Sequence, residues 1–240
     1  MSPSPRSIPT ADRISDMHDS ILCHILSFLP TKLASTTSIL SKRWKSVWLS
    51  VFTLNFDHES FQNFNSFHKF VFSTMFSLRD KNISIHSFTF KCGQSSRFNQ
   101  KDFNRIFKFV MHRGVKTLNF NMSNKKRQIK LPTRILGFNK TLRVLKLGNI
   151  QIGDFDQVDF PCVKTLELYK VTFISHEYIV KFLLGCPILE DLYTKSLVSK
   201  LSLVPIENLN PLPNLVEVRI CCDLNTTLIC KTKVLHVEQV

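Results

Sequence analysis

Residues 12–57 read DRISDMHDSILCHILSFLPTKLASTTSILSKRWKSVWLSVFTLNFD, a stretch rich in apolar side chains at helical spacing. Its first apolar group keeps the three- and four-residue steps of an amphipathic helix: Ile21, Leu22, Ile25, Leu26 and Leu29. Pro30 stops this helix because its ring nitrogen cannot donate to the helical hydrogen bonds. We therefore predict a first helix that runs from about Asp19 to Phe28.

Two further short helices are expected after this proline. Thr31 is a candidate N-cap for a helix that carries Leu33 and Ala34. A third helix is indicated by apolar residues at steps of i, i+4, i+7 and i+8: Leu40, Trp44, Val47 and Trp48. A unit of roughly 45 residues is too small to bury so many apolar side chains against itself. We therefore expect part of this apolar surface to seek a partner.

Several short motifs in this stretch resemble the F-box of plant F-box proteins with leucine-rich repeats, of the FBD type. They are Asp12-Arg13-Ile14-Ser15, Leu29-Pro30-Thr31-Lys32, Leu40-Ser41-Lys42-Arg43-Trp44 and Trp48. The resemblance implies docking onto the adaptor subunit of a cullin and RING ubiquitin ligase of the SCF type. It also implies that the rest of the chain selects a protein substrate, and that this subunit carries no catalytic residue and needs no cofactor.

The resemblance assigns the adaptor contact to ten residues: Met17, His18, Ile21, Leu22, Ile25, Leu29, Pro30, Leu40, Trp44 and Trp48. For Leu22, Ile25 and Leu26 a place in the helical core is an equally good interpretation. Family members usually carry Leu-Pro where this chain has Met17-His18. Methionine can fill a leucine's space, but histidine lacks the fixed φ of a proline at a first helical position. The departure at His18 therefore predicts weaker adaptor docking.

A second pattern, apolar-x-x-apolar-x-apolar, recurs along the chain. Its clear copies are Val51/Leu54/Phe56, Ile85/Phe88/Phe90, Val115/Leu118/Phe120, Leu142/Leu145/Leu147, Val163/Leu166/Leu168 and Leu215/Val218/Ile220. Weaker copies are Leu189/Leu192/Thr194, Val198/Leu201/Leu203 and Thr232/Leu235/Val237. The steps from Leu54 to Leu166 are 34, 30, 27 and 21 residues, and two steps of 26 residues follow. Steps in the twenties are typical of leucine-rich repeats.

Each copy predicts a strand, because side chains two residues apart in an extended chain share one face. Stacking the nine copies predicts one curved parallel sheet whose return segments are partly helical, at residues 61–75, 103–110 and 179–183. Gly185-Cys186-Pro187 is expected to end the last of these helices with a glycine cap and a proline stop. Residues 163–168 and 183–192 also resemble the repeats of the plant family.

The predicted fold class is α/β, with a three-helix F-box followed by a leucine-rich-repeat solenoid. We expect a flexible tail at residues 1–11, the F-box at 12–57 and the repeat region at 58–240. Members of this family commonly run longer, with more repeats and a further C-terminal domain. The repeat region of this chain is therefore expected to be short or truncated.

The outward positions of the predicted strands form a candidate substrate face. They are Lys116, Asn119, Arg143, Lys146, Lys164, Glu167, Glu190, Tyr193, Glu217 and Arg219. Basic residues come first along the chain and acidic residues follow. This gradient favours a partner with an acidic or phosphorylated end that Arg143 and its neighbours would contact. An ordinary solvated strand face is the alternative interpretation.

The net charge of +14 is concentrated in the middle of the chain. Residues 79–146 hold 17 Lys and Arg against Asp80 and Asp102, whereas residues 151–240 hold 8 basic and 11 acidic residues. Such a face could attract nucleic acid, although phenylalanines at core spacing make this the less favoured function. Lys125-Lys126-Arg127 is a short candidate for nuclear import. A non-ligase scaffold with a decayed adaptor site is a further alternative.

Sequence motifs for an enzyme are missing. The chain has no G-x-S-x-G elbow, no glycine-rich phosphate loop and no H-E-x-x-H helix. Its seven cysteines are odd in number and never spaced as C-x-x-C, which favours buried free thiols over disulfides or a metal site. Without a membrane-length apolar run or a hydrophobic signal core, we expect a protein of the nucleus or cytoplasm that has no membrane partner.

Overall fold

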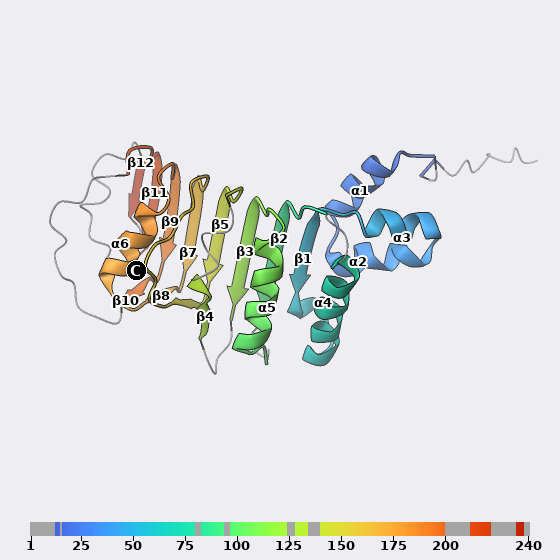
Figure 1. Cartoon of the computed structure of the whole chain (residues 1–240), viewed down its shortest axis with the longest axis horizontal. Helices are drawn as coiled ribbons and strands as arrows, with labels where there is room; N and C mark the ends of the chain where they lie inside the picture. The colour runs from blue at the N-terminus through green and yellow to red at the C-terminus, as the bar shows by residue number, and fades with distance from the viewer. Residues whose placement is uncertain are drawn as a thin grey trace, which may run out of the picture. The chain divides into compact units, whose positions relative to one another are not determined.

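The computed structural model contains two compact units, residues 1–51 and residues 52–240 (Figure 1). The first is a small group of helices and the second is a repeat array, and each is described by itself. For residues 220–221 and 234–237 the backbone alone is described. The structure describes residues 13–14, 16–79, 83–93, 97–123, 128–133, 140–199, 212–221 and 234–237.

The first unit contains the three predicted helices. They are α1 (Asp19–Ser27), α2 (Thr31–Thr36) and α3 (Lys42–Trp48), with a 3-10 turn η1 (Thr37–Ile39) before α3. Their shared core is formed by Leu22, Cys23, Leu26, Ala34 and Val47. Ser41 caps α3, because its Oγ accepts a hydrogen bond from the Trp44 amide at 3.2 Å. The prediction of three short helices is confirmed.

Thr31 does not cap α2, so that prediction is wrong. Pro30 occupies the cap position with φ −52°, and its carbonyl accepts hydrogen bonds from the Leu33 and Ala34 amides at 2.9 and 3.0 Å. Thr31 is instead the first helical residue and is buried. The fixed φ of the proline prepares the chain for the helix, and no side-chain hydrogen bond caps this end. Leu40, which was predicted to lie in the third helix, is instead the C-cap residue of the turn η1 and precedes α3.

The second unit is built on an eight-stranded parallel sheet in the order β1-β2-β3-β5-β7-β9-β11-β12 (Figure 1). Its strands are β1 (Thr53–Asp57), β2 (Ser87–Cys92), β3 (Thr117–Met122), β5 (Val144–Gly148), β7 (Thr165–Tyr169), β9 (Asp191–Lys195), β11 (Glu217–Cys221) and β12 (Val234–Val237). Strand β1 lies inside the range predicted for the F-box, but it pairs with β2 in this sheet. The compact units divide between Val51 and Phe52.

The repeats set the register of this sheet. Leu118 aligns with Leu145, Leu145 with Leu166, Leu166 with Leu192, and Leu192 with Val218. All five side chains are buried, and each contributes roughly 1.5–3 kcal/mol relative to full exposure. The predicted solenoid with stacked parallel strands is confirmed.

Val198, the first residue of the predicted copy Val198/Leu201/Leu203, does not join this sheet, so the prediction of nine stacked copies is wrong at that residue. Val198 begins β10 (Val198–Ser199), and Leu201 and Leu203 lie outside the described residues. Strand β9 ends at Lys195, which leaves too few residues before Val198 for another complete turn of the solenoid. This segment instead follows a corner into a second sheet.

The second parallel sheet has the order β10-β8-β6-β4 and was not predicted. Its other strands are β4 (Ile129–Leu131), β6 (Ile150–Ile152) and β8 (Thr172–Phe173). The corners between the two sheets carry residues with left-handed backbones: Asn149, Lys170 and Ser196, at φ of 56°, 50° and 53°. The Asn149 amide donates to the Tyr169 carbonyl at 2.8 Å, and the Lys170 amide donates to the Lys195 carbonyl at 2.7 Å. The corners therefore stack as the strands do.

Three helices form the return segments, as predicted: α4 (Phe64–Leu78), α5 (Gln100–Met111) and α6 (His176–Leu184). Figure 1 shows α4 and α5 beside each other along the sheet. Phenylalanine rings fill the space beneath them. The Phe120 ring centroid lies 5.4 Å from that of Phe88, 5.8 Å from that of Phe90 and 5.1 Å from that of Phe103. These aromatic side chains are core residues rather than stacking platforms.

Gly185 caps α6 at the predicted position, but its φ of −69° is not left-handed. Glycine is required for a different reason. A Cβ at this position would lie 2.5 Å from the Val158 carbonyl oxygen and 3.0 Å from the Val158 carbonyl carbon. The loop that carries Val158 passes so close to the helix end that no side chain fits there.

The substitution Gly185→Ala should destabilise the repeat unit by about 1–3 kcal/mol, because the added methyl group must displace the backbone. Gly153→Ala is the matched control, since no atom lies within 4 Å of a Cβ built there. Urea unfolding of both variants measures the effect. Equal free energies of unfolding for the two variants would contradict the close approach.

Candidate functional site

The helical unit exposes a group of large apolar side chains, which we call the apolar face. Four were predicted, namely Ile21, Ile25, Leu29 and Leu40, and four were missed, namely Ile14, Phe28, Leu33 and Ile39. Phe28 and Ile39 are 74% and 84% exposed. Phe28 follows Ile21 and Ile25 at i+7 and i+3, so helical spacing alone could have identified it. Eight exposed apolar residues within 27 positions form an unusually apolar surface for so small a unit.

The other predicted contact residues divide between core and surface. Leu22 and Trp48 are buried, at 1% and 7% exposure, and therefore pack inside the unit. Trp44 and Met17 are half-buried, and His18 and Pro30 are exposed. The role of the ten residues in adaptor binding stays a prediction.

His18 is the N-cap of α1 and not its first helical residue. Its backbone, at φ −63° and ψ 143°, lies within the range that a proline adopts. Its Nδ1 accepts a hydrogen bond from the Ser20 amide at 3.3 Å and lies 2.8 Å from the Ser20 hydroxyl. The imidazole thus provides a side-chain cap that proline cannot, while the local chain path remains compatible with proline.

Arg43 joins the beginnings of α1 and α3. Its Nε donates to Asp19 Oδ1 at 2.8 Å, and its Nη2 donates to the Met17 carbonyl. The carboxylate of Asp19 also lies in the first turn of α1, where the helix dipole favours a negative charge. These contacts explain why the Lys42-Arg43-Trp44 motif accompanies the residues around Met17: it holds them in place.

Six of the ten predicted substrate-face residues lie at outward positions of the large sheet and four directly precede its strands, and we call the surface that the ten form the sheet face. Asn119, Lys146, Glu167, Tyr193 and Arg219 form one row in the strand register. A second row precedes the strands, where the amides of Arg143, Lys164 and Glu190 each donate at 2.8 Å to the previous repeat. The remaining residues are Lys116, which begins that second row, and Glu217, which opens β11. The repeats therefore align, strand by strand, residues that span about a hundred positions of the sequence.

Six of the eight charged side chains of the sheet face are paired with one another. Lys146 Nζ lies 2.7 Å from Glu167 Oε1, and Lys164 Nζ lies 2.6 Å from Glu190 Oε1. Arg219 pairs with Glu217 at 2.6 Å. Exposed pairs of this kind contribute at most about 1 kcal/mol each. Their consequence is electrostatic: pairing within a strand and between neighbouring repeats neutralises part of the predicted gradient from basic to acidic.

A hollow of about 470 Å³ opens on the sheet face beside these pairs. Its walls are Thr165, Glu167, Asp191, Leu192, Tyr193, Glu217 and Arg219. Thr165 donates its hydroxyl hydrogen to Asp191 Oδ2 at 3.2 Å, which fixes that carboxylate. The hollow offers an aromatic ring next to fixed charges, an arrangement that suits a polypeptide side chain.

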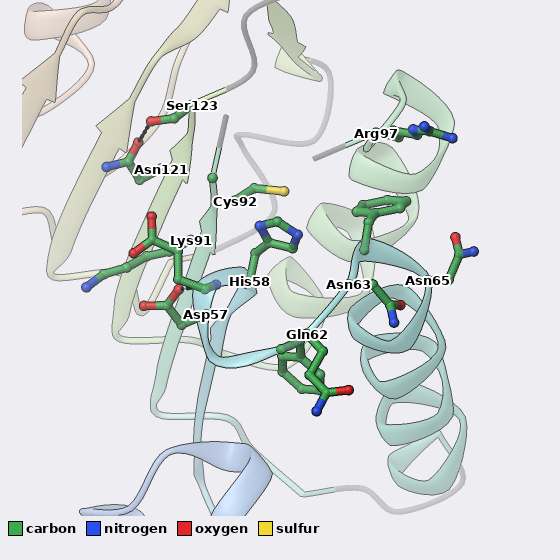
Figure 2. Close-up of a pocket in the computed structure, with 14 residues that line it drawn as sticks. Asp57, His58, Gln62, Asn63, Asn65, Lys91, Cys92, Arg97, Asn121 and Ser123 are labelled. Carbon is green, nitrogen blue, oxygen red and sulfur yellow. Dashed lines mark hydrogen bonds between the residues drawn. The ribbon is translucent and has the colours of Figure 1, made fainter. Parts of the chain in front are cut away.

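A second pocket, of about 1010 Å³, lies at the carboxyl ends of β1 to β3 (Figure 2). Figure 2 shows His58, from the 3-10 turn η2 (His58–Ser60), between Cys92 and Asn63. His58 is 6% exposed, and within the described part of the chain its Nδ1 has no hydrogen-bond partner. The charged lining is mixed, with two acidic and two basic side chains: Asp57, Glu59, Lys91 and Arg97. Sequence patterns did not indicate this pocket, because its walls come from separate repeats.

Among the described residues, no three His, Cys, Asp or Glu side chains are grouped to hold a metal ion. Burial raises the pKa of the Cys186 thiol to about 12, and burial followed by the Asp19 charge raises the pKa of Cys23. Both shifts disfavour the thiolate, which is the nucleophilic form. No helix in the described ranges is long and apolar enough to cross a membrane.

Comparison with known proteins extends these observations. Residues 14–54 match the F-box domain family, and residues 103–234 match the family described as FBD-associated F-box protein At5g56370, LRR repeats. Similar proteins of Arabidopsis thaliana include FBD-associated F-box protein At5g22730, 32% identical over 185 residues, and F-box/FBD/LRR-repeat protein At5g56420, 34% identical over 183 residues. F-box/LRR-repeat protein At1g55660, also of Arabidopsis thaliana, is 34% identical over 188 residues.

Each of these three alignments covers 75% of this chain, but only 39%, 43% and 51% of the respective relative. The chain thus spans about two fifths to one half of the length of these relatives. No solved structure matches it.

The architecture defines a leucine-rich-repeat solenoid that follows a small helical module. The chain belongs to the plant F-box proteins with leucine-rich repeats, as its motifs predicted.

The Cys186 thiol should resist alkylation in the folded protein at neutral pH, because its raised pKa leaves almost no thiolate. Half-buried Cys162 is the internal comparison. Iodoacetamide labelling followed by peptide mass spectrometry should modify Cys162 first and Cys186 only after addition of urea. Modification of Cys186 at the rate of Cys162 in native buffer would be inconsistent with the buried thiol.

Proposed function

We propose that this chain is the substrate-receptor subunit of a cullin-RING ubiquitin ligase of the SCF type. The apolar face docks on the adaptor subunit, and through it on the cullin, while the sheet face holds a protein substrate. The chain itself is non-catalytic and acts in the nucleus or cytoplasm. Its contribution is proximity, since holding a substrate near the charged conjugating enzyme raises the effective concentration of the substrate lysine.

The apolar face is the observation that carries this proposal. Ile21 and Ile25, on one side of α1, remain 49% and 42% exposed although Leu22 and Leu26, on the other side, are fully buried. Apolar residues on the second, exposed side of a helix are unfavourable in water unless another protein covers that side. Arg43 holds the start of this helix, so the surface is ordered before it meets a partner.

The sheet face supports the substrate half of the proposal. It presents side chains from at least five repeats in regular rows, and its hollow has an aromatic residue, Tyr193, and fixed carboxylates. Extended repeat surfaces of this kind suit another protein better than a small metabolite. Because Lys146, Lys164 and Arg219 are already paired, recognition here depends on shape and hydrogen bonding more than on net charge.

Co-purification with a plant adaptor of the Skp1 type tests the ligase role, with the natural chain and His18→Pro compared side by side. The backbone at His18 accepts proline, so the variant should fold and bind at least as tightly as the natural chain. If neither protein binds, the ligase role fails. If only the proline variant binds, this copy has lost its adaptor site and the alternative of a non-ligase scaffold holds.

The double substitution Ile21→Asp and Ile25→Asp should abolish co-purification with the adaptor, because two charges would enter an apolar contact. Folding should persist, since both side chains are exposed. Phe76→Asp is the control, because this side chain is also large, apolar and exposed but lies on α4. The docking surface would be wrong if the double variant bound as well as the control while circular dichroism showed both to be folded.

A further inference from the structure

Helix α5 carries a stripe of basic side chains on its outer side. Lys101, Arg105 and Lys108 follow each other at i, i+4 and i+7, and all three are exposed. Residues at this spacing are neighbours on one helix face. The opposite side of the same helix is buried under the sheet through Phe103, Ile106, Phe107, Val110 and Met111. The basic stripe and the sheet face therefore lie on opposite sides of the repeat array.

Few acidic residues are available as counterions for this stripe. Between residues 60 and 153 the sequence contains only two acidic residues, Asp80 and Asp102. Asp102 is engaged elsewhere, since its Oδ2 lies 3.1 Å from His68 Nε2 and accepts from Asn99 Nδ2 at 2.9 Å. Across the described ranges, no ion pair involves a side chain of the stripe. The sheet face is different, because three of its five cations, Lys146, Lys164 and Arg219, pair with carboxylates of the same face.

A hollow of about 510 Å³ lies along the stripe. It is lined by Gln100, Lys101, Asn104, Arg105, Lys108 and Pro132. The aliphatic stems of the basic residues and the proline ring provide an apolar floor. We call this surface the α5 hollow.

Two hydrogen bonds and a cation–π contact hold the residues around the α5 hollow in place. Gln100 Nε2 donates to the Lys130 carbonyl at 2.7 Å, and the Lys130 amide donates to Gln100 Oε1 at 2.8 Å. This pair of bonds fastens α5 to the edge strand β4, directly before Pro132. The Arg105 guanidinium lies over the Phe72 ring, 5.4 Å from its centroid, which restricts the position of the cation. The hollow is thus ordered without a ligand.

We infer that the α5 hollow binds an acidic, partly apolar segment of another protein. Carboxylates of such a segment would meet the three unpaired cations, with Arg105 able to donate two parallel hydrogen bonds to one of them. Leucine-like side chains would fill the apolar floor. This interaction goes beyond the proposed function, because it uses neither the apolar face nor the sheet face.

Two other polyanions fit the hollow less well. Single-stranded nucleic acid needs exposed aromatic stacking platforms, but the Phe72 ring beside the stripe is covered by Arg105. A membrane surface needs a broad basic face and gains nothing from a narrow hollow with an apolar floor. The hollow therefore favours a polypeptide that combines acidic and apolar side chains.

Fluorescence anisotropy with a labelled peptide of glutamate and leucine tests this inference on the full chain. The triple variant K101Q/R105Q/K108Q should bind the peptide about tenfold more weakly than the natural chain, since three charge-assisted contacts are lost. The control R79Q/K140Q/K170Q removes the same charge from exposed positions outside the hollow and outside the sheet face, and should bind normally. Added salt should weaken binding of the natural chain.

Three results would overturn the inference: no binding of the peptide, equal losses in the two triple variants, or tighter binding of oligothymidylate or of phosphatidylserine vesicles than of the peptide. Adaptor co-purification of both triple variants serves as an independent measurement. Because the apolar face is unchanged in them, failure of the α5 hollow and failure of the ligase role would be distinguishable.

Discussion

The stacking of one buried leucine row on the next is the interaction on which the repeat unit depends. A single repeat has two or three apolar side chains on one face of a short strand and cannot cover them by itself. Placing Leu145 against Leu118 and Leu166 covers both sides of the row, and the parallel register then continues strand by strand. The same register aligns the outward residues, so the sheet face is a direct consequence of the core.

The helical unit, in contrast, does not bury all of its apolar side chains. Its core is closed by a few side chains such as Leu22, Leu26 and Val47, and the remaining apolar residues stay in water. A unit of this size cannot bury both sides of its helices. The two units thus use apolar surface differently. The repeats bury their apolar side chains between stacked strands, whereas the helices leave apolar side chains exposed for contact with another chain.

The sequence predicted the features that depend on local spacing and missed those that depend on register. Strands β5 and β7 were predictable because Leu145/Leu147 and Leu166/Leu168 alternate with polar residues. The second sheet was not, because strands of two or three residues carry no periodic signal. The Lys146–Glu167 pair requires knowledge of which residues align across strands, and the burial of Leu22 beside exposed Ile21 requires knowledge of which helix side faces the core.

The heat-capacity change on binding of the adaptor tests the central claim most directly, because it reports how much apolar surface leaves water. Titration calorimetry at several temperatures should give a clearly negative heat-capacity change for the natural chain, as expected if Ile21, Ile25 and Phe28 become buried. A heat-capacity change near zero on binding would contradict the account, since the helical unit would then dock through its polar residues and the apolar face would remain in water.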